Sequence, residues 1–170
     1  MPDRDLTHFP LTRLLRRHVA IADELRRRGI ARSHNSPTGD LAEHLFCQAF
    51  GWDQAPNSEK SFDATTLAKE RVQIKACRLA HGKTSRQLSA IRNLDAGAFQ
   101  WLGGILFDHD YGVLRAALIP HAYVLANTTR SKHTNSRIFY LRDAVWDDPT
   151  VRDVTEEIRG ALAGIDREST

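Results

Sequence analysis

The chain has 170 residues, of which 41% are hydrophobic and 26% are charged, with 24 Lys and Arg against 21 Asp and Glu. This composition is typical of a soluble globular domain and excludes a disordered chain, a collagen-like chain and a small disulfide-stabilised fold. No apolar run approaches the roughly 20 residues that cross a bilayer, so we expect neither a membrane anchor nor a secretory signal. The two cysteines, Cys47 and Cys77, fit a reducing compartment, and we expect a cytoplasmic protein.

The charge is distributed unevenly along the chain. Residues 1–35 hold eight Arg and four acids and carry a net charge of +4, and residues 36–142 also carry +4. Residues 143–170 hold three Arg and eight acids and carry −5. A basic body with an acidic tail is compatible with nucleic-acid binding, and a solvated surface of mixed charge is the alternative.

Residues 1–35 are predicted to form a basic, helical N-terminal appendage. Pro10 suits a first helical turn and Gly29 a helix end. Apolar residues recur between them at helical spacing, and most of the arginines lie off that stripe. We expect this helix to contact a partner protein or a second copy of the chain.

Residues 36–170 are predicted to form one mixed α/β domain. Its first helix begins at Ser36 and Pro37 and ends at Gly51. On a helical wheel Glu43 falls at the border of the buried face, so its carboxylate can reach over the edge of whatever the helix packs against.

The period then changes from helical spacing to alternation. Residues 62–65 and 71–77 alternate with period two and predict a β-hairpin. Further along we expect a helix that begins at Ser85 and ends near Gly97. A second hairpin over 101–107 and 113–119, a helix over 121–130, a strand over 137–141 and an acidic helix over 150–163 complete the order of an α/β or α+β fold around one sheet.

Three polar residues of the first hairpin stand out. Gln73 and Lys75 point to one side of their strand, while Val72, Ile74 and Ala76 point to the other side. Asp63 lies opposite Gln73 on that polar side only if the loop between the strands has an odd number of residues or contains a bulge. A polar hairpin face with a chance charge pattern is the alternative interpretation.

The chemistry of this group suits a hard dication. A carboxylate, an amide oxygen and backbone carbonyls are the ligands that Mg²⁺ or Mn²⁺ prefers, and Glu43 could supply a second carboxylate. A lysine beside such a site can stabilise negative charge that grows on a phosphorus centre, or orient an attacking water. We therefore expect a phosphodiester-cleaving site.

Two segments resemble the PD-(D/E)XK nuclease superfamily of restriction endonucleases and Mrr-type enzymes. They are residues 39–46, with the sequence GDLAEHLF, and residues 61–76, with the sequence SFDATTLAKERVQIKA. The resemblance implies a restriction-endonuclease-like mixed sheet flanked by helices, here with an added N-terminal helix. It implies a Mg²⁺- or Mn²⁺-dependent endonuclease that acts on DNA. Residues 39–150 also resemble bacterial domains of unknown function on this fold.

The resemblance also implies a role for each residue of the group. Asp63 would be the central metal ligand, with Glu43, Gln73 and the backbone carbonyl of Ile74 as further ligands, and Lys75 would be the catalytic lysine. Gln73 stands in a position that is usually acidic, which weakens metal binding. A catalytically inactive module of this fold, binding DNA or a protein, is therefore the alternative.

Two polar segments are candidate phosphate contacts. The first supplies Lys83, Ser85, Arg86 and Gln87 at the start of the expected 85–97 helix, where N–H groups and cations could hold a phosphate. The second supplies Arg130, Lys132 and His133. For both segments a solvated loop is the alternative.

Overall fold

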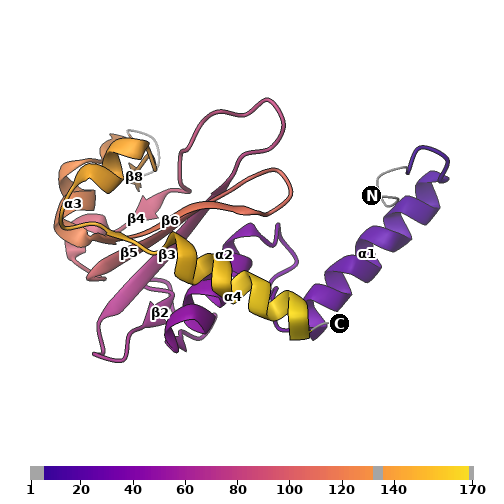
Figure 1. Cartoon of the computed structure of the whole chain (residues 1–170), viewed down its shortest axis with the longest axis horizontal. Helices are drawn as coiled ribbons and strands as arrows, with labels where there is room; N and C mark the ends of the chain where they lie inside the picture. The colour runs from indigo at the N-terminus through magenta and orange to yellow at the C-terminus, as the bar shows by residue number, and fades with distance from the viewer. Residues whose placement is uncertain (1–5, 132–135, 169–170) are drawn as a thin grey trace.

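The computed structural model describes residues 6–131 and 136–168 of the chain (Figure 1). They form a mixed α/β structure with parallel and antiparallel strands, as the order of periodic segments predicted. Lys132 and His133, two of the predicted phosphate contacts, lie outside the described residues. None of the described helices is both long enough and apolar enough to span a membrane.

The larger sheet runs through the centre of the structure. Its strands pair in the order β1 (Asp53–Gln54), β2 (Ala64–Thr65), β3 (Arg71–Arg78), β5 (Trp101–Phe107), β6 (Val113–Pro120) and β9 (Arg152–Asp153). The pair β3 and β5 is parallel and the other neighbours are antiparallel. Because parallel neighbours need a crossover, the chain between β3 and β5 passes over one face of this sheet.

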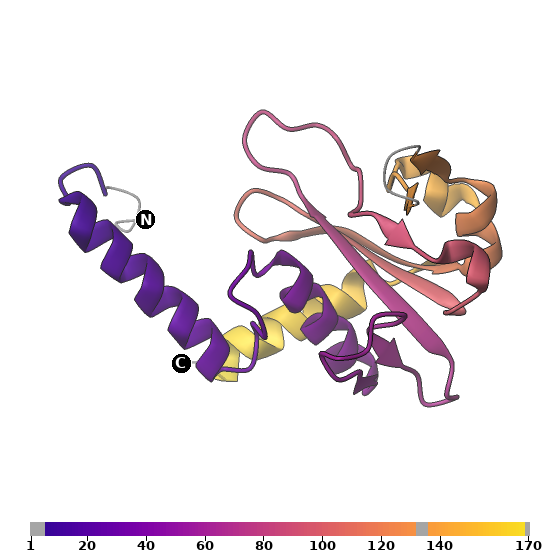
Figure 2. The same ribbon diagram turned by 180° about the vertical axis from the view of Figure 1, so that it is seen from behind.

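Helices α2 (Thr38–Phe50) and α4 (Thr155–Glu168) cover the opposite face, as the two views show (Figures 1 and 2). Their apolar side chains form a core with the strand residues that point toward them. Phe46 is fully buried and stacks on Trp52, with ring centroids 5.8 Å apart. A β-carbon at Gly103 would lie 2.9 Å from the Phe46 ring, so only glycine lets the helix approach β5 this closely.

The crossover face carries a second core. It is built from the segment 79–100, α3 (His121–Ala126), η3 (Asp143–Asp147) and a small sheet of β4 (Ile91–Arg92), β8 (Ser136–Ile138) and β7 (Thr129–Ser131). The side chains of Leu102, Leu106 and Leu88 are fully buried there. The central sheet is therefore covered on both faces, which fits the near-continuous apolar sequence of β5.

The prediction of a helix over residues 85–97 is wrong. The segment is extended: the Leu88 N–H donates to the Phe139 carbonyl, and Ile91 pairs with Arg137. Only η2 (Leu94–Ala96) makes a helical turn, of 3₁₀ type. Leu88, Ile91 and Leu94, which recur every three residues, are indeed buried. The backbone hydrogen bonds of the segment, however, are made to a distant strand and not within a helix.

Other boundaries also differ from those expected: the strand expected over 62–65 is β2, which takes only Ala64–Thr65. The acidic helix begins at Thr155 because β9 takes residues 152–153 into the sheet, and the Asp153 carboxylate accepts a hydrogen bond from the Thr155 N–H. Helix α3 ends at Ala126, and residues 129–131 pair in β7. The strand expected over 137–141 is β8 over residues 136–138.

Helix α1 (Leu11–Arg27) stands apart from these layers. It ends two residues before Gly29, whose φ of 72° stops the helix where the sequence predicted. The helix projects away from the sheet and approaches the rest of the fold only near its C-terminal end (Figures 1 and 2). None of its residues is buried.

Candidate functional site

The β2–β3 hairpin places Asp63 opposite Gln73. Ala64 pairs with Val72 and Thr65 with Arg71, so five residues, 66–70, form the loop. This odd number meets the condition that puts Asp63 and Gln73 on one side. The loop closes through the Thr66 N–H, which donates to the Glu70 carbonyl over 2.9 Å.

The Asp63 carboxylate is held by β3. Its Oδ2 accepts hydrogen bonds from the Gln73 Nε2 over 2.7 Å and from the Ile74 N–H over 2.6 Å. Strand β2 begins at Ala64, directly after Asp63, so β3 has no strand partner on this side beyond Val72. The Ile74 carbonyl points to the same open edge as the Ile74 N–H, because both groups of one strand residue face the same way.

Lys75 follows on the same side of β3 as Gln73. It is half-buried and makes no ion pair within the part of the chain that the structure describes. Its partner in β5 is Gly104, and the Leu141 side chain packs over that glycine. Among the described residues, therefore, no carboxylate neutralises the Lys75 ammonium.

Glu43 reaches the site from α2. Its side chain is 15% exposed, and its Oε2 accepts hydrogen bonds from Arg32 Nη2 over 2.7 Å and Gln54 Nε2 over 3.2 Å. Burial raises the pKa of Glu43, the nearby charge of Asp63 raises it further, and the Arg32 charge opposes both. The position at the border of the helix face thus brings a carboxylate to the edge of the sheet.

Glu43 and Asp63 line one cavity of about 340 Å³, open to solvent. The cavity brings together helix α2, the start of β2, the loop before β2 and the connector before α2. Its other polar lining residues are Arg32, Ser33, Asp40, Asn57 and Glu59. Two carboxylates from elements that are distant in sequence therefore face one space.

Arg32 is the residue of this cavity that sequence reasoning missed. Besides its bond to Glu43, its Nη1 donates to the Ala55 carbonyl over 2.9 Å. Its Nε is buried and has no hydrogen-bond partner among the described residues. The Asp40 Oδ2 accepts from the backbone N–H groups of Arg32 and Ser33, so Asp40 serves to hold the connector in place.

The predicted donors are of the type that a hard dication prefers, but only Glu43 and Asp63 of them line the cavity; Gln73, which is buried, and Ile74 do not line it. Two carboxylates, the Gln73 amide oxygen and the Ile74 carbonyl are oxygen ligands, and Mg²⁺ usually takes only one or two protein carboxylates and completes its shell with water and substrate oxygens. No cluster of three or more His, Cys, Asp or Glu side chains placed to hold a metal occurs among the described residues. A metal here would therefore depend on the amide, the carbonyl and the substrate for part of its shell.

The predicted phosphate contacts of the crossover lie elsewhere. Arg86 forms an ion pair of 2.6 Å with Asp143, Gln87 accepts a hydrogen bond from the Tyr140 hydroxyl, and the Ser85 carbonyl accepts one from the Cys77 thiol. None of these residues, nor Lys83, lines the cavity of Glu43 and Asp63. Ser85 and Arg86 instead line a separate pocket of about 380 Å³ with Arg142.

The cysteines are poor nucleophiles in this fold. Burial, with the nearby charge of Glu43, raises the pKa of the Cys47 thiol to about 11, and burial also raises the pKa of Cys77. Both thiols therefore stay protonated near neutral pH, in keeping with a packing role.

Comparison of the sequence with protein-family models gives no match, and comparison with curated proteins gives none either. The resemblance to PD-(D/E)XK nucleases therefore rests on the residues of the site and on their register.

The ion pair between Arg32 and Glu43 predicts a pH-dependent stability. Replacing Arg32 with Ala should lower the free energy of unfolding by about 2 kcal/mol at neutral pH, because it leaves a poorly hydrated carboxylate without its cation. The loss should shrink as the pH falls through the raised pKa of Glu43, since the protonated acid needs no counter-ion. Urea unfolding of both proteins at neutral and mildly acidic pH measures the difference.

Arg28→Ala is the matched control, because Arg28 pairs with Glu24 on an exposed helix surface and should contribute little at either pH. If Arg32→Ala lowers the free energy of unfolding equally at both pH values, Arg32 stabilises the fold through its hydrogen bond to the Ala55 carbonyl and not through the charge of Glu43.

Proposed function

We propose that the chain is a divalent-metal-dependent nuclease that hydrolyses phosphodiester bonds, in DNA and in the cytoplasm. The observation that carries the proposal is the meeting of Glu43 and Asp63 at one open cavity, next to a strand that presents Gln73, Ile74 and Lys75 in sequence. These are the residues, in the order, on which the resemblance to PD-(D/E)XK nucleases rests.

Each residue has a part in the proposed chemistry. Asp63, Glu43, the Gln73 amide oxygen and the Ile74 carbonyl would hold Mg²⁺ or Mn²⁺, which supplies positive charge to the reacting phosphate and makes an attacking water more acidic. Lys75, free of any ion pair in the described chain, would hold a phosphate oxygen or orient that water.

One observation favours a second candidate, a catalytically inactive module that binds DNA or a protein. Arg32 already neutralises Glu43 over 2.7 Å, so the chain's own cation occupies one oxygen of that carboxylate. The neutral Gln73 also makes the site less negative than a site with three acids.

A cleavage assay decides between these two functions. The purified chain is incubated with plasmid, single-stranded DNA and RNA, with Mg²⁺, with Mn²⁺ and with a chelator. Cleavage of DNA that requires the metal supports the nuclease. DNA binding without cleavage under any of these conditions supports the inactive module.

Replacing Gln73 with Glu should strengthen metal binding. A carboxylate is a better ligand for a hard dication than an amide, so Mn²⁺ affinity should rise by about tenfold and cleavage should begin at lower Mg²⁺. Without a metal, the same change sets two carboxylates against each other where Gln73 Nε2 now donates to Asp63, and it should only destabilise the fold. Calorimetric titration of Mn²⁺ into both proteins measures the outcome.

Gln48→Glu is the control, because Gln48 is exposed on α2 and the same charge change there should leave Mn²⁺ affinity unaltered. Equal Mn²⁺ affinity of wild type and Gln73→Glu would contradict the proposed metal site.

A further inference from the structure

Helix α1 exposes an apolar stripe that is not covered by the described part of the chain. Leu11, Leu15, Val19 and Ile21 are 71%, 56%, 55% and 62% exposed. An unsupported helix of 17 residues is only marginally stable in water, so α1 needs a partner to remain folded. Exposed stripes of this kind mark interaction surfaces.

A groove of about 830 Å³ lies along α1 beside these exposed residues; Ile21 lines it, whereas Leu11, Leu15 and Val19 do not. Its floor is formed by Leu14, His18, Ile21 and Leu25, whose spacing of four, three and four residues is that of a helix–helix seam. Arg17, Glu24 and Arg28 line one flank of the groove, and the Glu24 carboxylate accepts hydrogen bonds from Arg27 and Arg28 of its own helix. The groove therefore has the pattern of an apolar seam with charges beside it.

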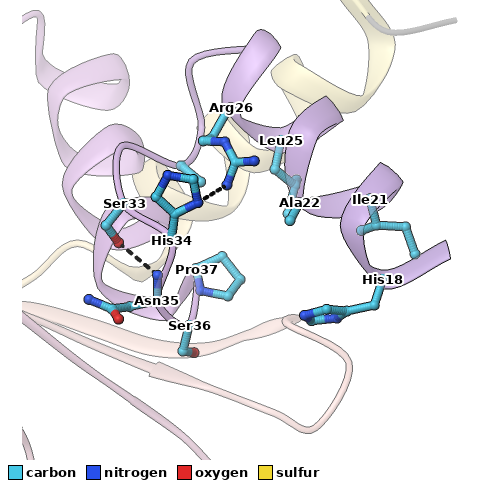
Figure 3. Close-up of a pocket in the computed structure, with 11 residues that line it drawn as sticks. His18, Ile21, Ala22, Leu25, Arg26, Ser33, His34, Asn35, Ser36 and Pro37 are labelled. Carbon is cyan, nitrogen blue, oxygen red and sulfur yellow. Dashed lines mark hydrogen bonds between the residues drawn. The ribbon is translucent and has the colours of Figure 1, made fainter. Parts of the chain in front are cut away.

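The other flank of α1 faces the rest of the fold. Figure 3 shows Ala22, Leu25 and Arg26 turned toward the connector 31–37, across a pocket of about 360 Å³. Arg26 Nη1 lies 2.9 Å from His34 Nδ1. The connector lines this flank but leaves the pocket between itself and α1 open, so a partner helix lies over the seam and can place a side chain in the pocket.

We propose that the partner is a second copy of this chain, bound through an antiparallel pair of α1 helices. A register that sets Leu14 opposite Leu25 of the second copy also sets His18 opposite Ile21, and the two-fold axis repeats both contacts. Arg17 then lies beside Glu24 of the second copy, and the reverse pair forms on the other side of the axis. Each Glu24 would then face Arg17 of the second copy in addition to Arg27 and Arg28 of its own helix, so one attractive contact is added on each side of the axis.

The alternative orientation of the two helices is disfavoured by charge. A parallel pair would bring together the C-terminal ends of the helices, where Arg26, Arg27 and Arg28 follow one another. The antiparallel pair keeps these ends a helix length apart, so like charges do not meet.

The same register also gives the exposed Leu15 a place. It sets Leu15 of the second copy level with the turn that holds Glu24 and Leu25, on the flank of the pocket between α1 and the connector. That pocket is lined by the apolar side chains of Ala22, Leu25 and Pro37, among others. Its volume of about 360 Å³ leaves room for a leucine side chain.

Sedimentation equilibrium of the full chain over the micromolar range tests the proposal. The wild type should sediment with twice the mass of one chain, and Ile21→Glu should sediment as a monomer. Ile21 is 62% exposed, so the substitution should leave the core intact, which circular dichroism and thermal unfolding of the domain can check. A monomeric wild type, or an Ile21→Glu protein that remains dimeric, would overturn the proposal.

Charge reversal tests the orientation. Arg17→Glu should weaken the dimer by about tenfold, because two attractive pairs become repulsive, and adding Glu24→Arg should restore it. Arg16→Glu is the matched control, since Arg16 lies on the far side of the helix, and it should leave the dimer unchanged. An equal loss with Arg16→Glu, or no rescue by the double variant, would place the contact elsewhere.

Cross-linking tests the register directly. A mixture of Leu14→Cys and Leu25→Cys chains should form a disulfide between the two different variants under mild oxidation. Each variant alone should cross-link no more than the wild type, which already contains the free cysteines Cys47 and Cys77. Cross-linking of Leu14→Cys with itself would indicate a parallel pair and contradict the proposed arrangement.

Discussion

Asp63→Asn should reduce metal-dependent cleavage by about 10²–10³-fold while the chain stays folded. The substitution removes the negative charge but keeps an oxygen that can accept from the Ile74 N–H, which now donates to Asp63 over 2.6 Å. Asp63→Ala is a less clean test, since it leaves the Ile74 N–H and the Gln73 amide without their acceptor, at a cost of about 1–3 kcal/mol. Initial cleavage rates on plasmid DNA measure the effect.

Lys75→Ala should reduce cleavage similarly, because it removes a cation from the reacting phosphate. Lys75 has no ion pair among the described residues, so its loss should change the free energy of unfolding little. Lys69→Ala is the control, since Lys69 is exposed in the β2–β3 loop and forms an ion pair with the exposed Asp53. If Asp63→Asn and Lys75→Ala cleave like the wild type, these residues are not catalytic.

Phe46→Ala should lower the free energy of unfolding by about 3–5 kcal/mol. Phe46 is fully buried between α2 and β5, its ring stacks on Phe50 and Trp52, and it fills the space over Gly103. Its removal leaves a cavity under the helix that carries Glu43. Urea unfolding monitored by circular dichroism measures the loss.

Two further variants sharpen this test. Phe50→Ala should cost less, because Phe50 is only partly buried. Gly103→Ala should destabilise the wild type, where the new methyl group meets the Phe46 ring at 2.9 Å, but it should be tolerated in the Phe46→Ala protein. Additive losses in the double variant would show that Phe46 and Gly103 do not share the contact described.

The local sequence determined much of the framework of the site. The helical spacing and Gly51, which ends α2 with a φ of 64°, predicted the helix that carries Glu43. The alternation of residues 71–77 predicted β3 and the side of it that Gln73 and Lys75 share. Both features follow from the fixed periods of helix and strand, so they can be read from neighbouring residues alone.

The sequence misled where distant pairing competes with local spacing. Leu88, Ile91 and Leu94 recur every three residues, yet the segment between Ser85 and Gly97 is held by Phe139 and Arg137, nearly fifty residues away. Side-chain spacing indicates which residues are buried. It does not indicate whether the backbone bonds are made within the segment or to another one.

The sequence by itself determined the fold class, the helix of Glu43 and the polar side of β3, because these depend on residues a few positions apart. Only the tertiary structure decided that the loop before β3 has five residues, that Glu43 and Asp63 share a cavity, and that Arg32 enters it. Arg32 is one of eight arginines in residues 1–35, and no spacing distinguishes it from the others. Its role arises from the packing of the connector against α2 and the loop before β2, which places its guanidinium between Glu43 and the Ala55 carbonyl.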